Sequence, residues 1–270
     1  MFTLLNTLPL QIKSPFLRKL MRIGWRNFVD SSSDSKRNKD VMIQGTSLVH
    51  FRVRRARPRD MPRVIRFVQQ NAPLMWPGAN IPTTSKSHVA VMTDLLSRSL
   101  SQGHTMLAEQ QEANRGWLQV RGLALNTSLT PWDATLLEKW AHCIQCDSSK
   151  KLILLSAQFL QAPGLHKKYM VSQILQILLL VPPDTPRASQ VAQVLAKASM
   201  HRGQDLGYKV IRFDVTSDLV NKVLSELKLT KEWETNVDSV FTKETNNQRK
   251  SSTKIKKIIV YTAFPQRDGK

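Results

Sequence analysis

The sequence predicts an α/β fold in which helices flank one central mixed β-sheet. Two observations support this. Segments with the two-residue alternation of strands are interleaved along the chain with segments that show the three- and four-residue spacing of helices. The chain is 270 residues long, which fits a single core with a short appendage. An interleaved order of strands and helices is typical of a sheet covered by helices.

The first half of the body shows both kinds of element. Apolar residues alternate after Phe51, and Met61–Pro62 opens a helix because proline suits the first helical turn. Prolines then mark a loop, and Thr84 provides an N-cap for the next helix. The expected elements are a strand at 51–57, a helix from 61, a loop at 71–84, a helix ending near 100, and hairpin strands at 104–109 and 117–126.

The second half repeats this alternation. Pro131 and Pro186 stand at expected helix starts, and Pro182–Pro183 ends the strongest strand. The longest apolar run, Ile177 to Val181, is far too short for a membrane span, so no transmembrane segment is expected. The expected elements are helices at 131–146 and 152–160, a strand at 171–181, a helix at 186–206, a strand at 208–215, a helix at 217–227, and strands at 233–242 and 255–264.

The N-terminal arm, residues 1–45, has a composition of its own. No acidic residue occurs from Met1 to Val29, whereas basic and apolar residues are interleaved at helical spacing, and a serine-rich stretch follows. An acid-poor, arginine-bearing amphipathic segment is typical of a mitochondrial transit peptide. We therefore expect a basic extension with a linker and a mitochondrial matrix location. An ordinary surface helix, a membrane-surface arm and a cytoplasmic location are the alternatives.

The formal net charge of +20 makes an acidic small-molecule carrier improbable and favours anionic partners such as nucleic acid. Residues 1–66 hold 15 Lys and Arg against 4 Asp and Glu, so much of the excess lies at this end. The arginines of residues 52–66 have two interpretations: a solvated edge strand protected by its charge, or a surface for a phosphate-rich partner.

Two cysteines, Cys143 and Cys146, exclude a disulfide scaffold and form a lone C-x-x-C. A structural zinc site needs more thiolate or imidazole ligands than this pair offers, so we expect no metal.

Three segments of the body, Ile174–Leu229, Phe51–Val68 and Arg121–Asn126, carry a family resemblance. In order and spacing they resemble the GNAT superfamily of N-acetyltransferases, and within it the insect arylalkylamine (dopamine) N-acetyltransferase-like proteins. The resemblance implies a GNAT domain over residues 50–265. It also implies acetyl-CoA as co-substrate and a small amine as acceptor.

The resemblance assigns cofactor binding to a strand edge and to the turn that follows it. The strand splays from its neighbour so that its backbone can pair with the pantetheine arm, and the turn directs N–H groups at the diphosphate. Gln190 replaces the family's central glycine, and Ser189 stands where a basic residue is usual. The implied residues are Leu179, Leu180 and Val181 on the strand, and Arg187, Ala188, Ser189, Gln190, Val191 and Ala192 in the turn.

At the catalytic positions the chain departs from the family. Ala72 stands where a Glu-Pro-Leu segment supplies the probable general base of the family. In the family's Thr-Ser-x-Tyr-Ser stretch, Thr216 and Ser217 keep two hydroxyls, and these are the implied proton-relay residues. Tyr169 and Asp214 either border the substrate cleft or serve as packing and strand-end residues.

Two functions follow from these residues. One is an acetyl-CoA-dependent N-acetyltransferase acting on an arylalkylamine-type substrate. The other is a catalytically degenerate GNAT-fold protein, a pseudoenzyme, that serves as a binding or scaffold module, with an anionic molecule as one partner class. In either case we expect a monomer.

Overall fold

A computed structural model gives the structure of residues 41–43, 50–77, 86–112, 116–236 and 257–265. The amphipathic segment and serine-rich stretch expected before residue 41 lie outside these residues. The targeting hypothesis for the arm therefore stays a prediction.

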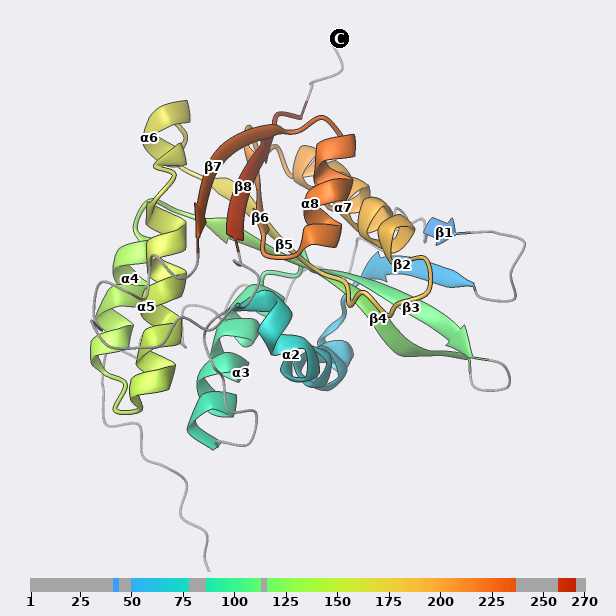
Figure 1. Cartoon of the computed structure of the whole chain (residues 1–270), viewed down its shortest axis with the longest axis horizontal. Helices are drawn as coiled ribbons and strands as arrows, with labels where there is room; N and C mark the ends of the chain where they lie inside the picture. Colours follow the sequence, from blue (N-terminus) through green and yellow to red (C-terminus); the bar gives the residue numbers. More distant parts are fainter. Residues whose placement is uncertain (1–40, 44–49, 78–85, 113–115, 237–256, 266–270) are drawn as a thin grey trace, which may run out of the picture. The chain divides into compact units, whose positions relative to one another are not determined.

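The strands of the described residues form one eight-stranded sheet in the order β1-β2-β3-β4-β5-β6-β8-β7 (Figure 1). Neighbouring strands are antiparallel except for β5 and β6, which are parallel, so the predicted mixed sheet is confirmed. The strands are β1 Val41–Ile43, β2 Phe51–Arg55, β3 Met106–Glu112, β4 Gly116–Leu129, β5 Ile174–Leu180, β6 Ile211–Val215, β7 Thr230–Asn236 and β8 Lys257–Ala263.

Helices cover both faces of the sheet (Figure 1). Helix α7 contacts strands β2 to β5 on one face and packs beside α8, whereas α2 contacts β4 and β5, and α3 contacts β4, on the other. Helix α5 packs against α3 and α4. The helices are η1 Pro58–Asp60, α2 Met61–Met75, α3 Lys86–Ser101, α4 Asp133–His142, α5 Asp147–Gln161, α6 Leu165–Tyr169, α7 Ala188–Asp205 and α8 Asp218–Glu226.

Helix α2 is longer than its sequence predicts. The prolines of residues 71–84 indicated a loop, but the helix continues to Met75 across a kink. Asn71 has non-helical backbone angles at this kink, and its side-chain amide donates to the Phe67 carbonyl at 2.9 Å. A kink with its own hydrogen bond accommodates Pro73, which cannot donate within a regular helix. The prediction of a loop from residue 71 was therefore wrong for residues 71–75.

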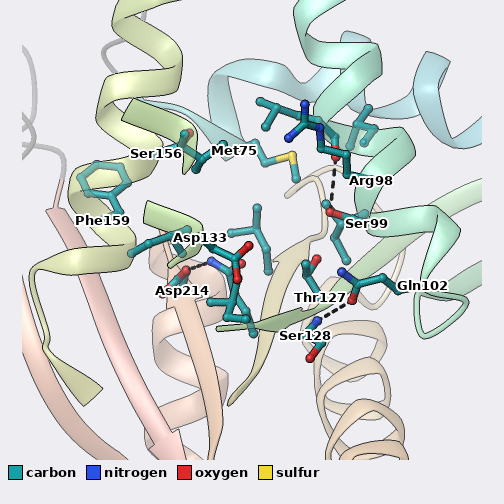
Figure 2. Close-up of a pocket in the computed structure, with 18 of the residues that line it drawn as sticks. Met75, Arg98, Ser99, Gln102, Thr127, Ser128, Asp133, Ser156, Phe159 and Asp214 are labelled. Carbon is teal, nitrogen blue, oxygen red and sulfur yellow. Dashed lines mark hydrogen bonds between the residues drawn. The ribbon is translucent and has the colours of Figure 1, made fainter. Parts of the chain in front are cut away.

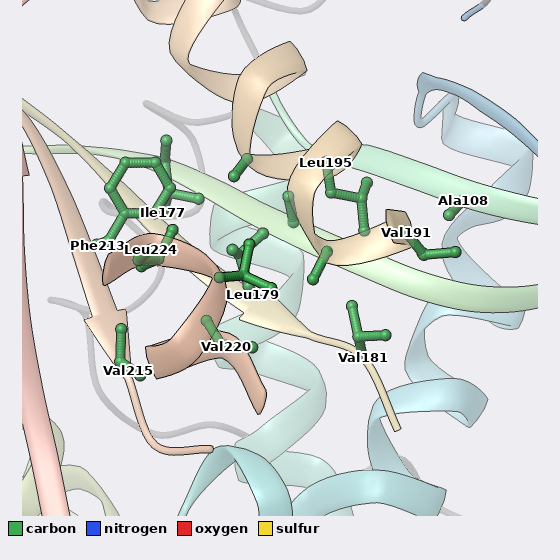
Figure 3. Close-up of a cluster of buried hydrophobic side chains, with 14 of the residues drawn as sticks. Ala108, Ile177, Leu179, Val181, Val191, Leu195, Phe213, Val215, Val220 and Leu224 are labelled. Carbon is green, nitrogen blue, oxygen red and sulfur yellow. The ribbon is translucent and has the colours of Figure 1, made fainter. Parts of the chain in front are cut away.

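The α7 face of the sheet holds the larger buried apolar cluster, which includes Leu179, Val181, Val191 and Val215 (Figure 3). Helix α7 approaches β4 closely at Gly122. A Cβ atom on Gly122 would lie 2.9 Å from Leu195 Cδ1 and 3.0 Å from Val191 Cγ1. The absence of a side chain at this position thus lets the first turns of α7 sit against the sheet.

The basic strand β2 is an interior strand, because it pairs with β1 on one side and with β3 on the other. The interpretation as a solvated edge is therefore wrong. Arg54 is only 8% exposed and bonds both carboxylates of a buried ionic cluster, with NH1 2.7 Å from Asp60 Oδ2 and Nε 2.8 Å from Glu109 Oε2. Arg52 and Arg63 also donate to Glu109. Three arginines of the basic segment thus neutralise internal carboxylates.

The ionic cluster sets the protonation of its two acids. Burial alone would raise the pKa of Glu109, but hydrogen bonds from Arg54 and Arg52 outweigh it and the pKa is lowered below its ordinary value of 4.5. Burial would likewise raise the pKa of Asp60. Hydrogen bonds from Arg54 and from the Arg57 backbone N–H outweigh this effect, so the pKa of Asp60 is lowered. Both carboxylates are charged at neutral pH, and they tie β2, β3 and the start of α2 together.

We expect Glu109→Gln to lower the free energy of unfolding by about 3 kcal/mol near pH 7, because it leaves buried arginines with one carboxylate fewer. A carboxylate with a lowered folded-state pKa stabilises the protein above its unfolded-state pKa, and this contribution is lost as the pH falls through the folded-state value. Wild-type stability should therefore decline below about pH 4.5. The variant should decline less steeply.

Urea denaturation across a pH series measures both effects. Glu226→Gln, at an exposed position that ends α8, is the matched control and should leave stability nearly unchanged. A Glu109→Gln variant as stable as wild type at pH 7 would contradict a structural role for the cluster.

Candidate functional site

The parallel strands β5 and β6 part before either strand ends. Their ladder runs from Leu175 to Leu178, and its last pair joins Leu178 to Asp214. Strand β5 nevertheless continues along β4 to Leu180, and β6 continues along β8 to Val215. Among the described residues, no strand pairs with the edge of β5 that faces β6 beyond Leu178. The backbone groups on that edge are therefore placed to bind an extended ligand.

Helix α7 begins shortly after this edge. Its N-cap, Arg187, has a left-handed backbone with φ 55°, and no side chain caps the helix start. The first N–H groups of a helix have no partner within the helix and carry partial positive charge. Ser189 and Gln190 are exposed, whereas Ala188, Val191 and Ala192 are buried in the α7-face cluster. The open helix start suits an anionic group.

The three strand residues predicted to bind a cofactor are divided between the two faces of the sheet. The side chains of Leu179 and Val181 belong to the α7-face cluster, and that of Leu180 belongs to the cluster beneath α2 and α3. All three are at most 4% exposed. Their side chains therefore build the core, and only their backbone groups are available at the parted edge.

A pocket of about 210 Å³ lies on the opposite face of the sheet from α7 (Figure 2). Its walls come from α2, α3, α4 and α5, and its floor from β4, β5 and β6. Because Leu178 and Asp214 both line it, the pocket reaches the point at which β5 and β6 part. Its apolar lining includes Met75, Trp76, Leu95, Leu125, Leu136 and Phe159, and its polar lining includes Ser99, Thr127, Ser156, Gln176, Asp214 and Thr216.

The predicted catalytic residues do not all reach this pocket. Thr216 lines it, and its hydroxyl donates to the Leu74 carbonyl at 2.5 Å, which joins the end of β6 to the end of α2. Ser217 is the N-cap residue of α8 and is not part of the pocket lining. Ala72 is 0% exposed and belongs to the apolar cluster beneath α2. The structure therefore brings Thr216 to the pocket and keeps Ala72 in the core.

Asp214 and Tyr169 have different surroundings. Asp214 lines the pocket, where its Oδ1 accepts a hydrogen bond from Arg212 Nε at 2.6 Å and its Oδ2 accepts one from Gln176 Nε2. Tyr169 instead donates to Glu232 and stacks edge-on against Phe264, with ring centroids 5.0 Å apart. Asp214 therefore lines the cleft, whereas Tyr169 packs against Phe264.

The remaining sequence motifs lie outside this site. Cys143 is exposed at the end of α4, and Cys146 directly precedes α5. Over the part of the chain that the structure describes, no group of three or more His, Cys, Asp or Glu side chains is placed to hold a metal ion. Over the same residues, no helix combines the length and the apolar character needed to cross a bilayer.

The fold has close structural relatives, although no protein-family model and no curated protein sequence matches the chain. It is similar to a mosquito arylalkylamine N-acetyltransferase-like protein, 5b, with a TM-score of 0.66 and 14% identity over 80% of this chain and 100% of that one. It is also similar to arylalkylamine N-acetyltransferase 2 of Aedes aegypti, with a TM-score of 0.64 and 22% identity over 79% of this chain and 98% of that one. This chain has the GNAT fold.

A third GNAT structure is the polyamine N-acetyltransferase of Drosophila melanogaster, which catalyses the formation of N-acetylagmatine. It matches with a TM-score of 0.62 and 12% identity, over 80% of this chain and all of that one. Identities this low establish the fold alone. The amine and the chemistry of this chain have to be argued from its own residues.

Sequence reasoning missed much of the pocket of this GNAT domain. The helices that form its walls come from distant parts of the chain, and a single sequence does not show how they pack. One signal was present in β6. Arg212, Asp214 and Thr216 place a polar residue at every second position of an apolar strand, and all three lie on the pocket side of the sheet. A polar stripe on a buried strand indicates a functional face.

The position of Ala72 gives a direct test of its role. Ala72→Glu places a carboxylate in a fully buried apolar cluster, so we expect it to lower the free energy of unfolding by about 3 kcal/mol. Chemical denaturation measures this loss. Gln70→Glu adds the same charge at an exposed position of α2 and should leave stability within about 0.5 kcal/mol. An Ala72→Glu protein as stable as wild type would show that residue 72 faces a ligand site instead of the core.

Proposed function

We propose that this protein is an acetyl-CoA-dependent N-acetyltransferase whose acceptor is a small amine with an apolar body. The observation that carries the proposal is the meeting of two features at one point. The parted edge of β5 reaches the end of the β5–β6 ladder from one side, and the pocket reaches it from the other. A donor held along the edge and an acceptor held in the pocket would come into contact there.

The residues of the donor site fit acetyl-CoA through their backbone. The free edge of Leu179–Val181 can pair with an extended pantetheine arm, and the N–H groups of Ala188 to Gln190 can bind the diphosphate. The exposed Gln190 side chain leaves the helix start open, although the family has glycine there. When bound, acetyl-CoA supplies the acyl thioester that reacts with an amine.

The chain's own groups prepare the acceptor side. The apolar pocket walls exclude water, which strengthens polar interactions inside the pocket. A backbone N–H of the Leu179–Val181 segment is placed to stabilise a developing oxyanion, a contribution that in enzymes is worth about 3 kcal/mol per donor. Holding the reactants in one geometry contributes further. The amine has to lose a proton before it attacks the thioester, and with no carboxylate at Ala72 the pocket hydroxyl of Thr216 would relay this proton toward solvent.

The size and the lining of the pocket support an arylalkylamine-type acceptor. A volume of about 210 Å³ accommodates one ring with a short aminoalkyl chain. Trp76 and Phe159 offer aromatic surface, and the walls around them are mainly leucine. The pocket therefore has the character of a site for a compact molecule with a single polar end.

A second function, a GNAT-fold binding module without catalysis, is favoured by one observation. The position at which the resemblance places a general base holds Ala72, which supplies no carboxylate and is buried in the core. A protein of this kind would use the pocket to bind a partner without turnover. The same experiment distinguishes it from an enzyme.

The test is an assay of acetyl transfer to tyramine, in which release of the CoA thiol is measured. Calorimetric titration with acetyl-CoA measures binding. We expect micromolar to millimolar binding and amine-dependent thiol release. Ser189→Asp places a negative charge at the exposed start of α7, which favours the helix but repels a diphosphate. It should weaken acetyl-CoA binding at least about tenfold without loss of thermal stability.

Lys197→Gln is the matched control, because it makes the same change of charge at an exposed position farther along α7. It should bind acetyl-CoA as wild type does. Binding without turnover would favour the binding module. No acetyl-CoA binding at millimolar concentration, or equal binding by wild type and Ser189→Asp, would contradict the proposed donor site.

A further inference from the structure

One acidic side chain of the pocket has no assigned role in the function proposed above. Asp214 is 8% exposed and lines the apolar pocket. It also forms the last pair of the β5–β6 ladder with Leu178, so it stands where the two strands begin to part. A carboxylate at this point would lie next to the reacting nitrogen of an acceptor.

The surroundings of Asp214 fix its carboxylate in one orientation. Arg212 Nε donates to Oδ1 at 2.6 Å, and Gln176 Nε2 donates to Oδ2. The remaining nitrogens of Arg212 donate to the carbonyls of Phe159 at 2.6 Å and Leu160 at 3.1 Å, in the last turn of α5. Each oxygen of an ionised carboxylate has a second lone pair, so Asp214 can accept one further donor from the pocket at each oxygen.

The other charged side chains of the pocket are engaged elsewhere. Arg98 pairs with Asp94, with NH2 3.1 Å from Oδ2, and lies over the Trp140 ring at 4.5 Å. Asp133 accepts from the backbone N–H of Thr130 at 2.5 Å and from its hydroxyl at 2.8 Å, in the turn that precedes α4. Asp214 is therefore the carboxylate at the floor of the pocket. Its ion pair with Arg212 occupies one lone pair of Oδ1, so a cation would be bound through the remaining lone pairs.

We propose that Asp214 binds the protonated amino group of the acceptor and thereby sets the preference of this pocket for a charged amine over a neutral molecule of the same shape. The ammonium group would replace solvent at the free lone pairs of Asp214, while the ring would lie against Trp76 and Phe159. Asp133, on α4, is the other carboxylate of the pocket, and both hydrogen bonds from Thr130 reach its Oδ2, so the Asp133→Asn variant tests whether it contributes to cation binding. This assignment rests on the proposed function for its meaning in catalysis, but the binding itself does not require turnover.

The experiment compares two ligands of nearly equal shape, tyramine and its neutral alcohol analogue tyrosol, by calorimetric titration of the full-length protein. A charge-assisted hydrogen bond within a largely buried site should make tyramine bind about tenfold more tightly than tyrosol or better. Asp214→Asn should abolish this preference by weakening tyramine about tenfold while changing tyrosol less than about twofold. Asp133→Asn, the matched control in the same pocket, should keep the preference.

Because Asp214→Asn breaks the buried ion pair with Arg212 and alters the bond with Gln176, a thermal melt of this variant and a second variant together separate binding from folding. Gln176→Met removes the amide donor but keeps the Asp214 carboxylate, so the preference for tyramine should survive. Equal affinity of wild type for both ligands, no binding of tyramine, or an unchanged preference in Asp214→Asn would each overturn the proposal. If the preference for tyramine depends on Asp214 but the protein transfers no acetyl group, the proposed role of Asp214 is supported. Only the proposed enzyme function is then contradicted.

Discussion

The incomplete pairing of β5 and β6 is the constraint on which the candidate site depends. Strand β5 is held along its full length by β4, and β6 is held by β8, so each strand follows a different partner beyond Leu178 and Asp214. The close approach of α7 to Gly122 fixes the helix start beside the same edge. Backbone groups that a continuous sheet would use internally are thus made available to a ligand.

The features that follow from local periodicity could be predicted from the sequence. The apolar run ending at Val181 predicts β5, and Pro186 at an expected helix start predicts α7. The GNAT resemblance then implies which backbone edge is free. Features that depend on packing could not be predicted. The continuation of α2 past Pro73 needs the Asn71 kink, and the interior position of β2 depends on carboxylates supplied by η1 and β3.

Arg54 illustrates why charge alone does not predict the surroundings of the basic segment. A run of arginines indicates a solvated edge or an anionic partner when its surroundings are unknown. In the folded chain, Glu109 and Asp60 lie beneath this run and bind Arg54 on both sides of its guanidinium. The walls of the pocket show the same limit, because α3, α4 and α5 converge only in three dimensions. Within the pocket, the alternation of polar residues along β6 was the usable signal.

The backbone of the candidate site has the free strand edge and the open helix start that the GNAT resemblance implies. Its side chains differ from the family at Ala72, Ser189 and Gln190. The free edge and the open helix start depend on topology, so they tolerate Gln190 and Ser189. The residue at position 72 is alanine, and one acidic residue of the pocket, Asp214, stands on β6. If the proposed acetyl transfer takes place, it depends on positioning and electrostatics more than on a dedicated base.

The most direct test of this account is backbone hydrogen–deuterium exchange of the full-length protein with and without saturating CoA. If the parted edge and the start of α7 form the donor site, the amides of Leu179 to Val181 and of Ala188 to Gln190 should become protected. The α3–α5 walls of the pocket should change little. Protection confined to other segments, or none at a concentration that saturates binding, would contradict the claim that the parting of β5 and β6 creates the site.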